Sequence, residues 1–216
     1  MDFFEVVHTQ RAIRRFKSDL VPDELIWQII DAAIRAPSGG NTQPWAFLVV
    51  RDSPKKARMA DALRRDPEEV AAMQAEAQTF DPTRKRMRMG SIALRENIAA
   101  APVIVIPCLV SPTSPSRDMT SIWSGSSIYQ AVQNLMLAAR ALGLGTVMTT
   151  ANVHIEGLIR AEFGIPEHAM PVALIPVGYP DGPAFGPTIR KPVESVTYWD
   201  AWEATHERAR TASQSS

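Results

Sequence analysis

Two short stretches of the sequence carry side chains that could bind a charged or planar ligand. The first holds Arg11, Arg14, Arg15 and Lys17 within seven residues. Arginines three residues apart can converge on one phosphate, because the planar guanidinium donates paired hydrogen bonds to its oxygens. A basic cluster of this kind is also typical of a solvated turn. The cluster alone leaves an anion site and an exposed turn both open.

The second stretch is "PSGGNTQPW", residues 37–45. Ser38, Asn41 and Gln43 supply hydrogen-bonding side chains, and the two glycines let the backbone approach a flat ligand. The alternative is a plain helix-to-strand connection in which Ser and Asn only cap. Because the loop holds more polar groups than capping requires, a ligand-binding loop is favoured.

Most other chemistries lack their motif. The sequence has no GxxxxGK[ST] phosphate loop, no GxGxxG and no GxSxG nucleophile elbow. The histidines lack metal-ligand spacing, so no metal site is predicted; they are His8, His154, His168 and His206. No nucleophile lies beside a base. We therefore predict no dedicated catalytic residue.

Composition excludes several partners. The 23 basic and 23 acidic residues give a formal net charge of zero, which argues against nucleic acid and against an anionic membrane. No apolar run is long enough to span a bilayer, and the first residues do not resemble a signal peptide. The single cysteine, Cys108, indicates a reducing, cytoplasmic setting. Its apolar neighbours favour a buried filler over a reactive thiol.

Hydrophobic patterning predicts an α+β sandwich in which residues 1–216 form one domain. The expected strands are 45–50, 102–110, 146–150 and 171–180. The expected helices are 22–36, 55–65, 91–101, 127–145 and 154–164, with Gly143 as the stop of the fourth. A short C-terminal helix is expected to begin at residue 198, followed by a disordered tail that reaches 216. Residues 66–90, polar and rich in Met between Pro67 and Pro82, are expected to be an inserted flap. A solvated helical excursion is the alternative for that segment.

The segments "RAIRRF", "AIRAPSGGNTQPWAFLVV", "AVQNLMLAARALGLGT", "VMTTAN", "PVALIPVGYP" and "IRKPVESV", in this order, resemble the nitroreductase superfamily of FMN-dependent oxidoreductases. Residues 52–100 contribute no recognisable motif to this resemblance. The resemblance implies a three-layer α-β-α sandwich on a mostly antiparallel sheet. It also implies an intertwined homodimer with FMN at the subunit interface, and a lid formed by residues 66–90.

The same resemblance implies the residues that hold FMN. Arg11 and Arg14 would bind the phosphate. Many relatives have Arg-Arg-Ser where this chain has Gln10-Arg11-Ala12, so Arg15 or a backbone N–H, as at Ala12, would compensate. The remaining implied contacts are Ser38, Asn41 and Gln43 at the ring, Thr149 and Thr150 over one ring face, and Arg190 and Lys191 at the phosphate or pyrimidine edge. Without the resemblance, Arg190 and Lys191 would be taken for an exposed basic tail.

The implied activity is hydride transfer from NAD(P)H through FMN to an electron-poor nitroaromatic or quinone, by a ping-pong mechanism. One alternative is reductive dehalogenation, as in relatives resembling iodotyrosine deiodinase. Those grip their substrate with a Glu, a Tyr and a Lys of the lid, and residues 52–100 contain no Tyr. Cleavage of reduced flavin is a second alternative, and non-catalytic flavin binding is a third.

Overall fold

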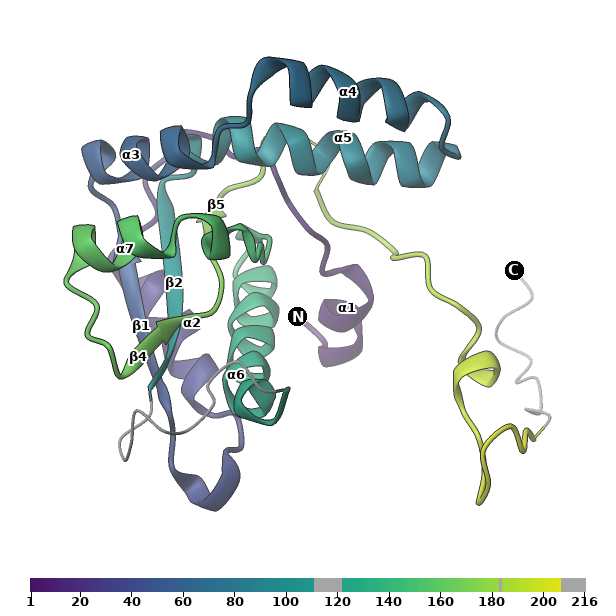
Figure 1. Ribbon diagram of the computed structural model, residues 1–216. Helices are drawn as coiled ribbons and strands as arrows, with labels where there is room; N and C mark the ends of the chain where they lie inside the picture. Colours follow the sequence, from purple (N-terminus) through teal and green to yellow (C-terminus); the bar gives the residue numbers. More distant parts are fainter. Residues whose placement is uncertain (111–121, 183, 207–216) are drawn as a thin grey trace. The chain divides into compact units, whose positions relative to one another are not determined.

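In the computed structural model, which describes residues 1–110, 122–182 and 184–206, helices cover both faces of one antiparallel sheet (Figure 1). The α-helices are α1 (Phe3–Thr9), α2 (Asp23–Ile34), α3 (Ser53–Leu63), α4 (Pro67–Gln78), α5 (Pro82–Asn97), α6 (Ile122–Ala141) and α7 (Glu156–Phe163). The strands are β1 (Trp45–Val50), β2 (Val103–Val110), β3 (Gly145–Thr146), β4 (Ala169–Pro171) and β5 (Ile175–Gly178). Short 3-10 turns span Gly39–Asn41, Ile98–Ala100, Ala151–His154 and Val193–Val196.

The chain divides into two units: Met1–Gly186, with the sheet, and Pro187–Ser216. The sheet order is β1-β2-β5-β3, with β4 also paired to β2, and every pair of these strands is antiparallel. Within the described residues, no helix is both long and apolar enough to cross a bilayer.

The side chains of β2 point alternately into two hydrophobic cores, one on each face of the sheet. Val103 and Val105 are fully buried in a core shared with α2 and α6. Ile104 and Ile106 are fully buried on the opposite face, against α3 and α7. Successive side chains of a strand point to opposite faces, so an unbroken apolar run has to be covered on both. The predicted α+β sandwich with a mostly antiparallel sheet is confirmed.

A one-residue β-bulge separates β4 from β5. Cys108 pairs with Pro171, whereas Val105 pairs with Ile175, so the register shifts by one residue between these pairs. Pro107 lies at this point of β2 and has no N–H to donate, while its carbonyl accepts from the Val172 N–H at 2.9 Å. A proline inside a central strand is tolerated at such a bulge. The segment predicted as one strand is therefore two.

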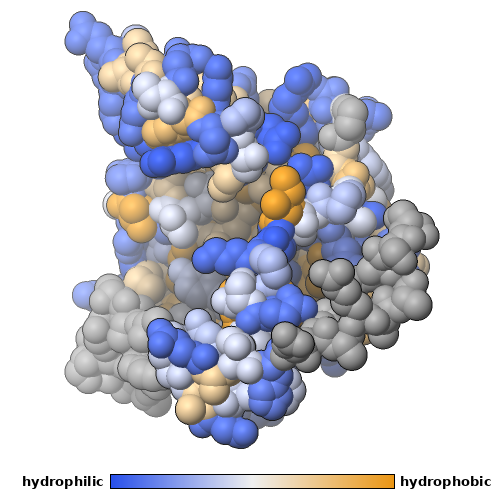
Figure 2. Space-filling view, turned by 90° about the vertical axis from the view of Figure 1, so that its right-hand side faces the viewer, coloured by the Kyte–Doolittle hydropathy of each residue, from blue (hydrophilic) through white to orange (hydrophobic). Residues whose placement is uncertain are grey.

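Other elements differ from expectation in extent. The region predicted as strand 146–150 has only Gly145–Thr146 in the sheet, plus an isolated bridge from Thr149 to Leu174. Residues 66–90 form α4 and the first half of α5, a helical hairpin whose outer surface is mostly hydrophilic (Figures 1 and 2). Residues 198–206 form bends and a turn in place of the expected helix, and 207–216 lie outside the described residues.

Candidate functional site

The loop before β1 has an unusual backbone. Gly40, Asn41 and Gln43 have φ angles of 59°, 51° and 48°. The left-handed region suits glycine and is tolerated by asparagine, but it strains glutamine by about 1–3 kcal/mol. The Ser38 hydroxyl oxygen stabilises the turn by accepting from the Gln43 N–H at 3.0 Å. Non-glycine residues persist in this region where the surroundings hold them, and such sites cluster at ligand clamps.

The side chains of Asn41 and Gln43 project from this loop. Both residues are exposed, and neither side chain hydrogen-bonds to another described residue. Ser38 is half-buried, and its hydroxyl oxygen is already engaged by the loop backbone. The loop thus presents two amide side chains as free donors and acceptors, while the Ser38 hydroxyl has a structural role.

The basic segment of residues 11–17 lies along the opposite edge of the sheet. The Ile13 N–H donates to the Thr146 carbonyl at 2.9 Å, and Ala12 bridges to Thr146 in parallel. Ile13 packs so closely on Gly145 that a Cβ there would lie 2.7 Å from its Cγ2. Gly145 therefore holds this segment in place, and the alternation leaves Arg11 and Arg15 exposed with Arg14 half-buried.

The three arginines of this segment differ in how their charge is balanced. Arg15 donates to the Asp181 carboxylate at 2.7 Å. Arg11 makes no ion pair with any described residue, and neither does Arg14. The one hydrogen bond from the Arg14 side chain to a described residue is the 3.5 Å donation from its Nη1 to the Ala12 carbonyl. Burial lowers the pKa of Arg14, because the cation is desolvated there. Within the part of the chain that the structure describes, Arg11 and Arg14 therefore have no counter-charge, as an anion site requires.

Arg14 also lies against α5. A Cβ at Gly90 would be 3.2 Å from the Arg14 Cδ, so the absence of a side chain at Gly90 lets the guanidinium stem pass close to the helix. This cradle joins the basic segment to the helical hairpin. Nothing in the motif around Arg14 predicted a role for Gly90.

The threonine segment lies beside the bulge. The Thr149 N–H donates to the Leu174 carbonyl at 3.0 Å, and the Thr149 hydroxyl accepts from the Ala151 N–H at 3.3 Å. Thr150 is exposed. Asn152, which sequence reasoning missed, is 1% exposed; its Nδ2 donates to the Pro171 carbonyl at 2.8 Å, and its Oδ1 has no partner. Its only sequence signal was its place at the end of "VMTTAN".

Two predicted basic residues lie in the second unit. Arg190 and Lys191 are exposed, and Nη1 of Arg190 donates to the Ile189 carbonyl at 2.9 Å. Neither makes an ion pair with a described residue. Their part in a cofactor site remains a prediction.

The two halves of the predicted site lie at diagonally opposite corners of the sheet. Trp45, which follows the polar loop, pairs with Leu109 near the end of β2. Thr146, which holds the basic segment, pairs with Val177, and Val177 pairs with Val103 at the beginning of β2. Along the strands, the halves are six residues apart at about 3.3 Å each. Across the sheet, they are three or four strand spacings of about 4.8 Å apart, so the diagonal between them is roughly 25 Å. The covered sheet fills the space between them.

The burial of Cys108 decides between a reactive thiol and a core filler. Cys108 is 4% exposed, and burial raises the pKa of its thiol to about 11. A thiolate is the reactive form of cysteine, so a thiol kept protonated by burial is inert near neutral pH. Cys108 is a core residue.

The fold and these motifs define an α-β-α sandwich of the nitroreductase type. The model of the nitroreductase family matches residues 7–179. A Methanothermobacter thermautotrophicus protein, whose name pairs NADH dehydrogenase with NAD(P)H nitroreductase, is 35% identical over 186 residues, covering 83% of this chain and 78% of that protein. The chain belongs to the nitroreductase family and is an oxidoreductase, as the resemblance predicted.

Two further relatives bear on the cofactor and the alternative activity. The structure of an FMN- and NADPH-dependent nitroreductase from Sphigopyxis sp. superposes with a TM-score of 0.70 at 20% identity, covering 94% of this chain and all of that one. Mouse iodotyrosine deiodinase 1 is 29% identical over 192 residues, 88% of this chain and 66% of the deiodinase. Of these two names, the nitroreductase's alone gives cofactors, FMN and NADPH, and at 20% identity this likeness shows the fold.

Proposed function

We propose that this protein is an FMN-dependent NAD(P)H oxidoreductase that works as a homodimer. The observation that carries the cofactor assignment is the half-buried Arg14, whose charge no carboxylate among the described residues balances. A phosphate there would restore the balance, with exposed Arg11 beside it in the segment. The donor set therefore fits the phosphate of FMN.

The homodimer is proposed because one chain cannot present both halves of the site to one flavin. The sheet and its covering helices stand between the basic segment and the polar loop. In a symmetric pair, Arg11 and Arg14 of one subunit would instead meet Asn41 of the partner subunit and Gln43 of the partner subunit. Exposed apolar side chains support association, for example Phe4 at 66%, Trp27 at 67% and, in the second unit, Trp202 at 81%.

Bound FMN would supply the redox chemistry, taking hydride from NAD(P)H and passing it to an electron-poor acceptor in a ping-pong cycle. The chain's own residues bind and orient. Arg11 and Arg14 hold the anionic end, and the amides of Asn41 and Gln43 can both donate to and accept from the polar edge of a planar ring. Thr149 and Thr150 would lie over one ring face, and the α4–α5 hairpin would act as the lid. We place the reaction in the cytoplasm, since the sequence has a single cysteine.

A visible spectrum followed by anaerobic titration tests the proposal. The purified protein should be yellow, and stoichiometric NADH or NADPH should bleach the flavin band. A colourless protein that does not respond to added FMN would refute the proposal. Bound flavin that neither nicotinamide bleaches would favour a non-catalytic flavin-binding protein. Light scattering on the same sample should give the mass of two chains.

Reductive dehalogenation is the second candidate, favoured by the deiodinase relative. Residues 52–100, which include the hairpin, lack the Tyr of the deiodinase lid pattern. Anaerobic incubation of the reduced protein with 3-iodotyrosine discriminates between the two. Release of iodide at a rate comparable with nitroaromatic reduction would make dehalogenation the primary activity.

A further inference from the structure

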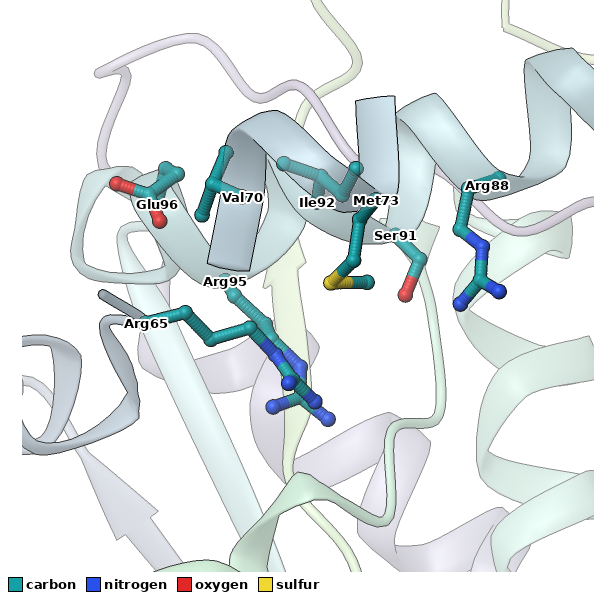
Figure 3. A pocket seen from close by; sticks show the side chains of 8 residues that line it. All are labelled: Arg65, Val70, Met73, Arg88, Ser91, Ile92, Arg95 and Glu96. Atoms are coloured by element: carbon teal, nitrogen blue, oxygen red, sulfur yellow. The ribbon is translucent and has the colours of Figure 1, made fainter. Parts of the chain in front are cut away.

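A second group of arginines lies where α3 gives way to the α4–α5 hairpin. Arg65 precedes α4, and Arg88 and Arg95 belong to α5; together they line a pocket of about 80 Å³. Figure 3 shows the guanidinium groups of Arg65 and Arg95 side by side and pointing the same way. The rest of the lining is Val70, Met73, Ser91, Ile92 and Glu96.

The carboxylates around this pocket are already engaged. Nη1 of Arg65 bonds to Glu69, but its Nε is buried without a partner. Nη2 of Arg88 lies 2.9 Å from Glu76. Glu96, which also lines the pocket, lies 3.8 Å from Nε of Arg64. Arg95 makes no ion pair with a described residue.

Arg95 is held in an unfavourable environment. Burial lowers the pKa of Arg95, and the neighbouring Arg65 cation lowers it further. Its place in the last turn of α5 offers only the partial negative charge of a helix end. The buried Nε–H of Arg65 has no acceptor, and the charges of Arg65 and Arg95 repel each other; both features cost free energy. One bound oxyanion would relieve both.

The pocket and the Arg14 contact share helix α5, on different faces, since five residues turn about 140° around a helix. Gly90 of α5 contacts Arg14, and Arg95 is five residues further along that helix, about 7.5 Å along its axis. Val70, Met73 and Ile92 add apolar contacts beside the guanidinium groups. A pocket of this size admits one oxyanion group with part of an apolar body, and it is too small for a whole dinucleotide.

We propose that Arg65 and Arg95 form a subsite for a carboxylate or phosphate group carried by a small substrate of this enzyme. The proposal rests on the proposed function, since the anion would belong to the electron acceptor or to the nicotinamide dinucleotide. Paired donation from two guanidinium groups would hold the charged end, and the apolar lining would contact the adjoining carbon skeleton. The hairpin would then select anionic substrates over neutral ones.

Matched neutral and anionic substrates test the proposal. The kcat/KM of Arg95→Gln should fall about tenfold or more for 4-nitrobenzoate, the loss expected for charge-assisted hydrogen bonds, with nitrobenzene unchanged. A loss confined to NADPH, with NADH unchanged, would assign the subsite to the dinucleotide's extra phosphate. Arg95→Lys should recover part of the loss. Arg86→Gln, which removes an exposed charge from the same helix, is the control. It should leave kcat/KM unchanged for both 4-nitrobenzoate and nitrobenzene.

A second measurement does not depend on flavin turnover. Calorimetric titration with sodium benzoate should show binding to the wild-type protein and to Arg86→Gln, and weaker binding to Arg95→Gln and Arg65→Gln, with circular dichroism confirming that each variant folds. Loss of benzoate binding in a protein that lacks flavin reduction would uphold the subsite while refuting the proposed function. Equal losses for neutral and anionic substrates, or unchanged anion binding and kinetics in both variants, would overturn the subsite.

Discussion

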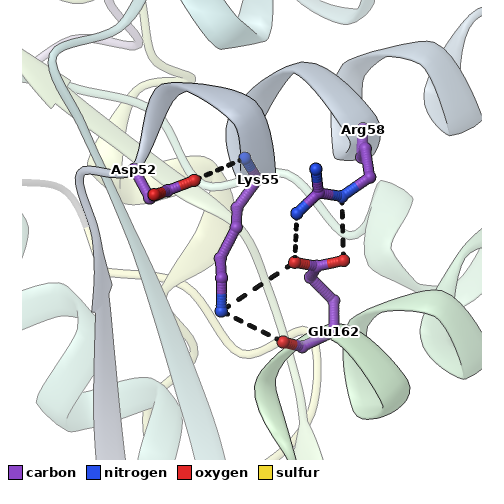
Figure 4. A network of polar contacts seen from close by, with 4 residues as sticks. All are labelled: Asp52, Lys55, Arg58 and Glu162. Carbon is purple, nitrogen blue, oxygen red and sulfur yellow. Dashed lines mark hydrogen bonds and ion pairs between the residues drawn. The ribbon is translucent and has the colours of Figure 1, made fainter.

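Two basic regions of this protein use their cations in opposite ways. On α3, Lys55 and Arg58 share the Glu162 carboxylate of α7, while Asp52 caps the helix by accepting from the Lys55 N–H at 2.8 Å (Figure 4). At the edge of β3, Arg11 and Arg14 have no carboxylate partner among the described residues. The first region joins two helices and balances its own charge. The second leaves its charge unbalanced among the described residues, and we propose that an anionic ligand balances it.

The contrast shows that basic composition does not by itself indicate a binding site. Arg15 looks like Arg14 in the sequence, yet the chain neutralises Arg15 internally through Asp181. What distinguishes Arg14 is partial burial without a counter-charge among the described residues, which costs free energy until an anion arrives. Substitutions at the paired and the unpaired cations test this distinction.

Arg14→Gln should weaken FMN binding about 10- to 100-fold, because hydrogen bonds to charged groups contribute about 1.5–3 kcal/mol each. Fluorescence quenching on titration of apoprotein with FMN measures the Kd. Lys17→Gln removes an exposed charge three residues away and is the matched control. An unchanged Kd in Arg14→Gln would remove the phosphate assignment.

Gly90→Ala should weaken FMN binding several-fold while leaving the protein no less stable. The added Cβ would lie 3.2 Å from the Arg14 Cδ and displace that side chain. Alanine is at the same time favoured over glycine within a helix by about 1 kcal/mol. The Kd should therefore rise while the thermal midpoint does not fall; a higher Kd together with a lower thermal midpoint would indicate general damage to α5.

Arg15→Gln should change the FMN Kd by about twofold or less, because Asp181 already balances the Arg15 charge. The same fluorescence titration measures the FMN Kd of Arg15→Gln for comparison with that of Arg14→Gln. A loss as large as that of Arg14→Gln would show that Arg15 compensates for the missing Arg-Arg-Ser pattern, as the family resemblance allows.

Glu162→Gln should lower the thermal midpoint slightly at neutral pH and have no effect on FMN binding. The Arg58 hydrogen bond holds the pKa of Glu162 below its ordinary value of 4.5. The folded state therefore gains stability from the ionised carboxylate above that value, and loses it as the pH falls through the lower, folded-state pKa. The difference between the melting points of wild type and variant should shrink over this acidic range; a constant difference would mean that the pair is not coupled to protonation.

Much of the fold was predictable because local patterns and tertiary packing agree. β1 matches its prediction, and the apolar run of β2 indicated burial on both faces. The stop at Gly143, with φ of 77°, and the end of α7 at Gly164, with φ of 63°, follow from glycine's access to the left-handed region. The bulge beside Pro107 was not predicted, because it depends on a partner strand more than sixty residues away in the chain.

The family, the sandwich and the residue types of the site follow from the sequence alone, since these depend on composition, periodicity and short motifs. Which charges are balanced depends on the tertiary structure, because Asp181 and Glu162 reach their arginines across more than a hundred residues. The tertiary structure also placed the loop and the basic segment at opposite corners of one sheet and brought Arg65 beside Arg95. Charge balance is a property of distances in space, and a linear sequence does not contain those distances.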